Sequence, residues 1–176
     1  EKEAVFYQRT WDYLAAAGFA QYEISNFARP GHTCQHNLNT WSMQEWVGFG
    51  PSAASQFEGW RASNPSDLAV WHTDVAASRR ATTDRTELTT ELLAADSVIF
   101  GLRANAGVSL PSLQRRFPTP AWAGLHDLLP RLLLEGLLVA SPEGRIQLTA
   151  RGRLLADAVG SEVLEAFAAE PEAGRP

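Results

Sequence analysis

The residues best suited to chemistry lie close together in the first quarter of the chain. His32, Cys34 and His36 alternate in the stretch HTCQH. In an extended backbone this spacing would place all three side chains on one side. Imidazole and thiolate groups ligate zinc, copper or haem iron. The spacing matches no standard zinc finger, so a solvated loop with an ordinary cysteine and two surface histidines is the alternative.

A glycine-rich run is the second candidate. Residues 48–53 (GFGPSA) match the letters G-x-G-x-x-A. A dinucleotide fingerprint needs a buried strand before the run and a helix after it, and the preceding QEWV is not such a strand. Pro51 also removes a backbone N–H that a phosphate cradle would use. We therefore expect a tight loop whose backbone approaches a ligand, or else a plain turn packed by Phe49.

Aromatic side chains surround both candidates. Five of them could wall a pocket for a flat ligand such as a porphyrin or adenine, although aromatic residues more often pack in a core. They are Trp41, Trp46, Phe49, Phe57 and Trp60. The other two histidines, His72 and His126, stand in helical contexts and suggest no catalytic arrangement with a serine and an aspartate.

The elements that must position these residues are predicted from apolar spacing. Residues 3–17 predict a helix that ends at Gly18, and residues 19–27 predict a strand with one polar face. In an open sheet that polar face would meet water, whereas in a (β/α) barrel it would point inward. Residues 28–60 show no clear periodicity, and residues 61–85 predict a polar connection with one short helix.

From residue 86 the pattern is typical of a small helical domain. The spacing of apolar residues predicts one helix after Thr89, a short second helix around Leu113 and a third over about 121–136. Pro130 lies inside the third helix, so we expect it to kink or split that helix.

Two short strands complete this second half. Residues 137–140 and 145–148 predict the strands, and Thr149 can cap a final helix. Three helices, a two-stranded wing and a further helix form a winged-helix-like arrangement. A DNA reader would present cations on its third helix, but here that helix is leucine-rich and holds only Arg131. A helical packing or lid module is therefore the favoured interpretation.

The composition restricts the classes of protein. The chain has 176 residues, a net charge of −5 and one cysteine, Cys34, which excludes an internal disulfide and an all-cysteine metal site. A single cysteine suits a reducing, cytoplasmic setting. No apolar run approaches the roughly 18–20 residues of a membrane-spanning helix. The chain opens at Glu1, within the pattern of a helix, so we expect the C-terminal part of a longer protein.

Several runs carry a resemblance to a known family. Residues 18–31 (GFAQYEISNFARPG) and 34–38 (CQHNL) resemble radical-SAM proteins related to oxygen-independent coproporphyrinogen III oxidase, in their haem-chaperone branch. The resemblance spans nearly the whole chain. Its further runs are GFGPSA at 48–53, GLR at 101–103, GV at 107–108, EGLL at 135–138 and LTARG at 148–152.

The resemblance implies a fold of the α/β plus α+β class. It implies the C-terminal remnant of a partial (β/α) radical-SAM barrel, followed by a helical, winged-helix-like cap domain. The implied parts are a barrel end with its ligand loop at 1–60, a connecting segment at 61–85, the cap domain at 86–168 and a disordered tail at 169–176.

The resemblance also implies cofactors. Family members bind a 4Fe-4S cluster through a CxxxCxxC motif, and S-adenosyl-L-methionine chelates the unique iron. One cysteine cannot supply three thiolates, so we expect the cluster and its chemistry only in a longer parent. The loop at 48–55 aligns with a segment that contacts S-adenosylmethionine. By this resemblance Ala54 is the contact, and Gly50 permits close backbone approach.

Haem is the implied cargo. The haem-chaperone branch carries an HNxxYW motif, which appears here as HNLNTW at 36–41, with Thr40 in place of tyrosine. The resemblance implies that His36 is the haem ligand, and Cys34 is an alternative thiolate ligand. The expected function is that of a cytoplasmic haem chaperone that delivers haem to an acceptor haemoprotein.

The expected partners follow from that function. They are haem or a porphyrin and the acceptor, with no nucleic acid and only transient membrane association through the acceptor. Two other functions stay open from the sequence. One is part of a true coproporphyrinogen III oxidase, and the other is a winged-helix module that binds DNA or a protein.

Overall fold

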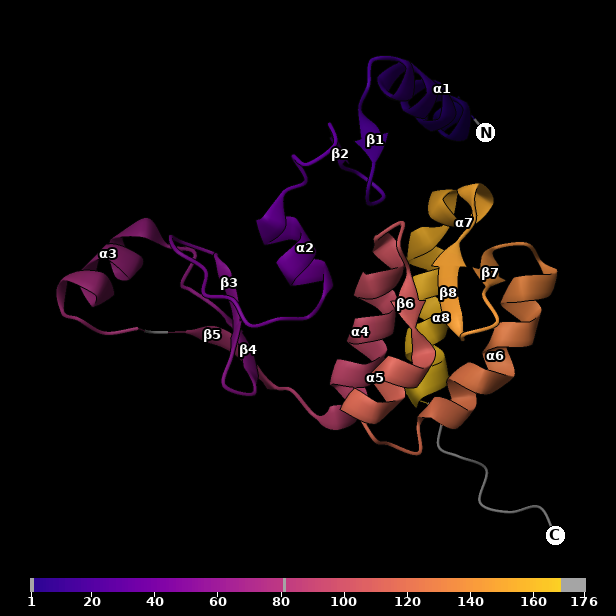
Figure 1. Cartoon of the computed structure of the whole chain (residues 1–176). Coiled ribbons are helices and arrows are strands. Elements are labelled where there is room, and N and C mark those ends of the chain that lie inside the picture. The colour runs from indigo at the N-terminus through magenta and orange to yellow at the C-terminus, as the bar shows by residue number, and fades with distance from the viewer. Residues whose placement is uncertain (1, 81, 169–176) are drawn as a thin grey trace, which may run out of the picture. The chain divides into compact units, whose positions relative to one another are not determined.

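The computed structural model describes residues 2–80 and 82–168 and divides the chain into two compact units (Figure 1). The first unit contains the residues up to Met43 and those from Thr90 onward, and the second runs from Gln44 to Thr89. The two units are defined by contacts within the structure and not by family membership. The domain boundaries at 60, 85 and 168, which come from the resemblance, therefore remain predictions. The predicted tail at 169–176 lies outside the described residues.

The second half of the chain builds the core of the first unit. Its helices are α4 (Thr90–Arg103), α5 (Leu110–Arg116), α6 (Trp122–Leu134), α7 (Ala150–Leu154) and α8 (Ala156–Ala168). Its strands are β6 (Val108–Ser109), β7 (Leu138–Ala140) and β8 (Arg145–Leu148). The strands form an antiparallel sheet in the order β6-β8-β7. The three predicted helices and two predicted strands are thus confirmed, whereas the two-residue β6 was too short to be predicted.

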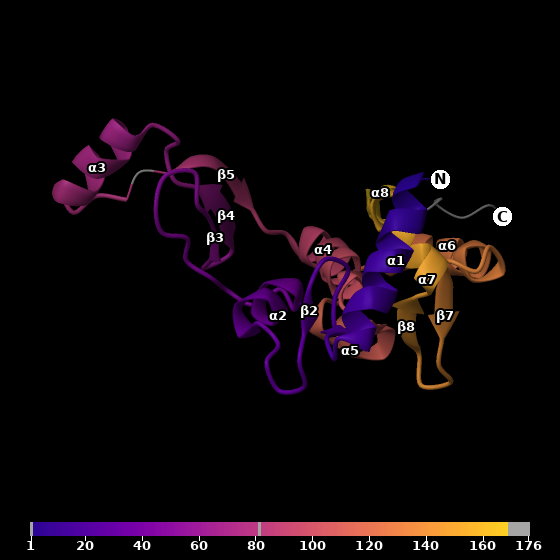
Figure 2. The same cartoon turned by 90° about the horizontal axis from the view of Figure 1, so that it is seen from above.

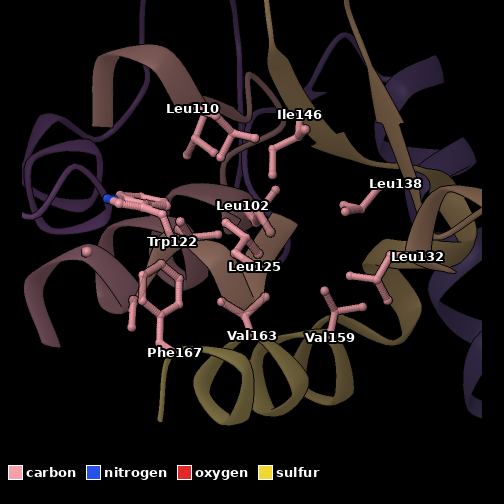
Figure 3. Close-up of a cluster of buried hydrophobic side chains, with 14 of the residues drawn as sticks. Leu102, Leu110, Trp122, Leu125, Leu132, Leu138, Ile146, Val159, Val163 and Phe167 are labelled. Atoms are coloured by element: carbon pink, nitrogen blue, oxygen red, sulfur yellow. The ribbon is translucent and has the colours of Figure 1, made fainter. Parts of the chain in front are cut away.

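The core of this unit lies where α4, α6 and α8 pack together and against the sheet (Figure 3). Leu125 and Leu132 of α6 and Val159 and Val163 of α8 are each at most 2% exposed. Since fully burying one such side chain contributes about 1.5–3 kcal/mol, this layer is a main source of stability. Pro130 lies inside α6, which continues past it as one helix, so the predicted split is wrong.

The first residues of the chain add α1 (Lys2–Ala16), β1 (Ala20–Gln21), β2 (Phe27–Ala28) and α2 (Gln35–Trp41) to this unit. The predicted helix at 3–17 is confirmed. A single strand over 19–27 is wrong, because β1 and β2 are two short strands that pair antiparallel with each other. The buried Glu23 holds the turn between them, since its Oε1 accepts hydrogen bonds from the Ser25 N–H and the Asn26 side-chain amide.

The second unit is a small antiparallel sheet with one helix. It contains β3 (Ala54–Phe57), β4 (Trp60–Ser63), α3 (Leu68–Ala76) and β5 (Thr83–Glu87), with the strands in the order β3-β4-β5. Glu58 and Gly59 both have positive φ and form the tight turn between β3 and β4. Asp67 caps α3 by accepting a 2.9 Å hydrogen bond from the Val70 N–H. The short helix predicted within 61–85 is confirmed, but the three strands were not predicted.

Candidate functional site

The sequence HTCQH does not adopt the extended conformation that would align its three ligands. Cys34 has an extended backbone and is the N-cap of α2, whereas His36 lies in the first turn of that helix. The chain therefore changes direction between them, and the alignment of His32, Cys34 and His36 that an extended backbone would give does not form. All three side chains are exposed. In the described part of the chain, no group of three His, Cys, Asp or Glu side chains is placed to hold a metal ion.

Trp41 fixes α2 on the core, while His36 stays exposed. The indole ring stacks on Phe100 of α4, with ring centroids 5.8 Å apart and an interplanar angle of 25°. The guanidinium of Arg103 lies 4.8 Å from the centre of the same indole ring. Thr40 donates a 3.0 Å hydrogen bond from Oγ1 to the His36 carbonyl, so its side chain supports the helix backbone. The arrangement offers one imidazole on an anchored helix, which can donate a single nitrogen ligand to a metal in a planar macrocycle.

The loop at 48–53 is held tightly by two polar side chains of the second unit. The buried Asn64 donates from Nδ2 to the carbonyls of Gly48 and Gly50, at 3.2 and 2.9 Å. The Gly48 N–H donates a 2.9 Å hydrogen bond to Oγ of Ser55. A Cβ at Gly48 would lie 2.2 Å from the Ala54 carbonyl oxygen, so the loop needs glycine there. This is the tight loop predicted from the sequence.

The same loop lines a cavity of about 530 Å³ in the second unit. Phe49 and Gly50 form one side of the cavity, and Trp71 and Val75 of α3 also line it. Gly50 has a φ of 98°, and a Cβ added there would meet no atom within 4 Å, so its backbone is open to a ligand. Ala54 does not line this cavity, because it lies in β3, where its carbonyl accepts a hydrogen bond from Trp46 Nε1.

The predicted aromatic wall is divided by the fold. Trp41 belongs to the first unit, and the four other aromatic residues belong to the second. Of those four, only Phe49 lines the larger cavity, whereas Phe57 and Trp60 line a separate hollow of about 200 Å³. The sequence did not identify Trp71 as a lining residue of the larger cavity. The available signal was that Trp71 lies in the short helix predicted within residues 61–85.

Two arginines and one carboxylate, Asp74, are the charged groups that line the larger cavity. Arg79 forms a 2.9 Å ion pair with Asp74, and Arg80 donates a hydrogen bond from Nη2 to Oγ of Ser55. Both arginines line the cavity beside Phe49 and Trp71. The cavity can therefore accept a flat ligand against the rings, with a polar end directed to the guanidinium groups.

Comparisons with known proteins match nearly the whole chain. Residues 88–155 match the family model of the HemN C-terminal domain. The chain is 35% identical over 173 residues to the heme chaperone HemW of Bacillus subtilis, which covers 97% of this chain and 44% of that protein. It is 34% identical over 149 residues to HemW of Mycobacterium tuberculosis, covering 83% of this chain and 35% of that protein. The chain thus spans less than half the length of these curated relatives.

A solved structure shows the same fold. It is coproporphyrinogen III oxidase (HemN) from Escherichia coli, described as a radical SAM enzyme, with a TM-score of 0.67 and 23% sequence identity. The match covers 91% of this chain and 39% of that one. The chain thus carries a HemN C-terminal domain at residues 88–155 and is similar over nearly its whole length to a protein named heme chaperone HemW.

Proposed function

We propose that the chain is part of a radical-SAM-type haem chaperone that binds haem and delivers it to an acceptor haemoprotein. The observation that carries this proposal is the similarity to a protein named heme chaperone HemW over 97% of the chain. Because the chain spans only 44% of that relative, the activity is proposed for the longer protein and not for these residues alone.

His36 is the proposed axial ligand of the haem iron. Its imidazole is exposed at the start of α2, and the stacking of Trp41 on Phe100 fixes that helix on the core. Neutral imidazole is a common axial ligand of haem iron. Cys34 is the alternative ligand, because its exposed thiol lies two residues earlier and can bind as thiolate.

S-adenosylmethionine and an iron–sulfur cluster are proposed for the longer protein. Gly50 fits a role in S-adenosylmethionine binding, because its open backbone lines the cavity of the second unit. Ala54 is proposed as a second contact on the resemblance alone. A 4Fe-4S cluster does not fit this chain, because one cysteine cannot supply its thiolate ligands. We therefore assign the cluster to another part of the longer protein.

We also propose the finer domain organisation. Residues 1–60 would be the end of a radical-SAM barrel, residues 61–85 a connection, and residues 86–168 a winged-helix-like cap. The order helix, strand, helix, helix and hairpin in the second half supports the cap. The lone cysteine supports a cytoplasmic location. We further propose that any membrane contact is transient and occurs through the acceptor. In the described residues no helix has both the length and the apolar character to cross a membrane.

The two other functions left open by the sequence, a coproporphyrinogen III oxidase and a winged-helix binding module, are not favoured. Similarity to the E. coli oxidase at 23% identity supports the fold and not the reaction. DNA binding is disfavoured by the net charge of −5 and by Arg131 of α6, which pairs with Glu135 and Glu162.

A haem titration of the longer protein, followed at the Soret band, tests the proposal. The His36→Ala variant should lose about tenfold or more in affinity, which is the effect expected when an axial ligand is removed. His72→Ala, which removes another exposed histidine in α3, should bind like the wild type. An unchanged affinity and Soret position in His36→Ala would remove His36 from the role. A loss confined to Cys34→Ala would assign the thiolate instead.

A second measurement separates the chaperone from the oxidase. Haem-loaded longer protein should transfer haem to an apo-haemoprotein. It should leave coproporphyrinogen unchanged under anaerobic conditions with S-adenosylmethionine and a reductant. Efficient decarboxylation of coproporphyrinogen would contradict the proposed function.

A further inference from the structure

Another cavity lies in the first unit, and none of the residues proposed to bind haem or S-adenosylmethionine lines it. It measures about 370 Å³, which is within the range of small-molecule sites. Figures 1 and 2 show α1 beside α7 in this unit, and the cavity is lined from both helices. Its walls include Tyr7 and Trp11 of α1, Ile24 of the β1–β2 turn, Arg103 of α4 and Arg153 of α7.

One arginine of this cavity carries an unused hydrogen-bond donor. Nε of Arg153 is buried and has no hydrogen-bond partner in the described residues, whereas Nε of Arg103 lies 4.0 Å from Oε2 of Glu23. Buried polar atoms of native proteins are nearly always paired, so an unpaired donor beside a cavity indicates a missing acceptor. The unpaired donor of Arg153 therefore points to an anion.

The two cations around the cavity differ in their partners. Arg103 lies between two carboxylates, with Glu23 at 4.0 Å and Asp157 at 3.7 Å. Arg153 forms no ion pair within the described ranges, and its guanidinium lies 5.2 Å from the ring centre of Trp11. Burial lowers the pKa of Arg153, because desolvation penalises the charged form. An anion beside Arg153 would offset this penalty through its attraction to the guanidinium.

The remaining walls suit a flat apolar body. The rings of Tyr7 and Trp11 lie 6.5 Å apart at an interplanar angle of 49°. The first turn of α8 also lines the cavity, with Ala156, Asp157 and Ala158.

We propose that this cavity binds a small organic monocarboxylate with a flat apolar body. The carboxylate would pair with the Arg153 guanidinium, and the body would lie against Tyr7 and Trp11. A single negative charge pairs with Arg153, the cation without an ion pair in the described residues, whereas a phosphate dianion would be repelled more strongly by Glu23 and Asp157. This inference does not rest on the proposed haem function, because it uses neither His36 nor the cavity of the second unit.

Isothermal titration calorimetry of the full chain with indole-3-acetate tests the site. We expect saturable binding with a Kd of about 0.1–1 mM, which is typical of one charged contact and one stacked ring. Indole-3-acetamide, which is neutral but has the same shape, should bind at least about tenfold more weakly. Equal affinity for the acid and the amide, tighter binding of phenyl phosphate, or the absence of saturable binding would overturn the proposal.

Arg153→Gln supplies the test within the protein, and Arg151→Gln is the matched control on the same helix. Arg151 donates to the Glu135 carbonyl and does not line the cavity. Arg153→Gln should weaken indole-3-acetate binding about tenfold or more, and Arg151→Gln should leave it within about twofold. Equal loss in both variants would reduce the effect to net charge and contradict a site at Arg153.

A measurement on the wild type keeps the inference testable if Arg153→Gln does not fold. In a ¹⁵N-edited NMR titration, the side-chain Nε resonance of Arg153 should shift with the same Kd as the calorimetry. The Trp11→Leu variant should also weaken binding while retaining both arginines. A shift of other arginine resonances without that of Arg153 would place the ligand elsewhere and overturn the proposal.

Discussion

The carboxylate of Glu23 lies 4.0 Å from the guanidinium of Arg103, and this pair joins the β1–β2 turn to the end of α4. Glu23 is fully buried. Two backbone contacts run beside the pair, because Glu23 forms a β-bridge with Ala104 and the Ile24 N–H donates a 3.1 Å hydrogen bond to the Arg103 carbonyl. The N-terminal hairpin is thus tied to the core of the first unit by a charged contact as well as by backbone hydrogen bonds.

Replacement of Glu23 by glutamine should therefore destabilise the first unit. The glutamine amide could still accept a hydrogen bond from the Ser25 N–H, but Arg103 would lose a buried counter-charge, and we expect a loss of about 2 kcal/mol. Urea denaturation followed by circular dichroism measures the change. Glu165→Gln on the exposed side of α8 is the control and should stay within about 0.5 kcal/mol of the wild type. Equal effects of the two substitutions would show that the buried pair contributes nothing.

Gly124 of α6 should tolerate no side chain. A Cβ at this position would lie 2.0 Å from the Ala166 carbonyl oxygen, which is backbone of α8 and cannot move without separating the helices. Gly124→Ala should cost about 1–3 kcal/mol through overpacking. Gly160→Ala is the matched control in α8, because its Cβ would meet only Cγ2 of Ile99 at 3.3 Å.

The control should change stability by less than about 1 kcal/mol, because alanine favours a helix over glycine and offsets the contact with Ile99. Thermal denaturation of both variants gives the comparison. A Gly124→Ala protein as stable as Gly160→Ala would mean that α6 and α8 are not packed as closely as described.

Thr149 should act through its hydroxyl and not through its size. Oγ1 accepts a 2.9 Å hydrogen bond from the Gly152 N–H and donates a 2.7 Å hydrogen bond to the Gly136 carbonyl. Thr149→Ala removes both and should cost about 1–2 kcal/mol, whereas Thr149→Ser keeps both and should cost about half a kcal/mol or less. Chemical denaturation midpoints distinguish them. Equal losses in the two variants would assign the effect to the lost methyl group.

The parts of this fold that could be predicted depend on short-range signals. Thr149 caps α7 as expected. Its hydroxyl accepts a hydrogen bond from the backbone N–H three residues later, and this pattern can be recognised within a short stretch of sequence. The spacing of Leu125 and Leu132 likewise predicts one buried face of α6, and both side chains are buried. In each case the residues that decide the structure are close in sequence.

The parts that could not be predicted depend on distant partners. The polar face of 19–27 suggested a barrel strand, but Glu23 is buried against Arg103, which no local pattern indicates. Residues 28–60 show no clear periodicity, yet residues 35–41 form a short helix whose Trp41 stacks on Phe100 of α4. The cavity of the second unit was missed for the same reason, because Trp71 reaches the glycine loop only through the fold.

Hydrogen exchange should distinguish the well-packed part of the chain from its beginning. The buried cluster of the first unit comes from residues 94–167, whereas α1 contains no buried residue. Local opening is easiest where few apolar contacts must break, so amides of residues 1–60 should exchange about a hundredfold faster than those of 86–165. Mass spectrometry of peptides from exchanged protein gives this comparison. Uniform protection across both ranges would show that residues 1–60 are as stable as the core without the rest of a barrel. That result would contradict the expectation that residues 1–60 are part of a larger barrel.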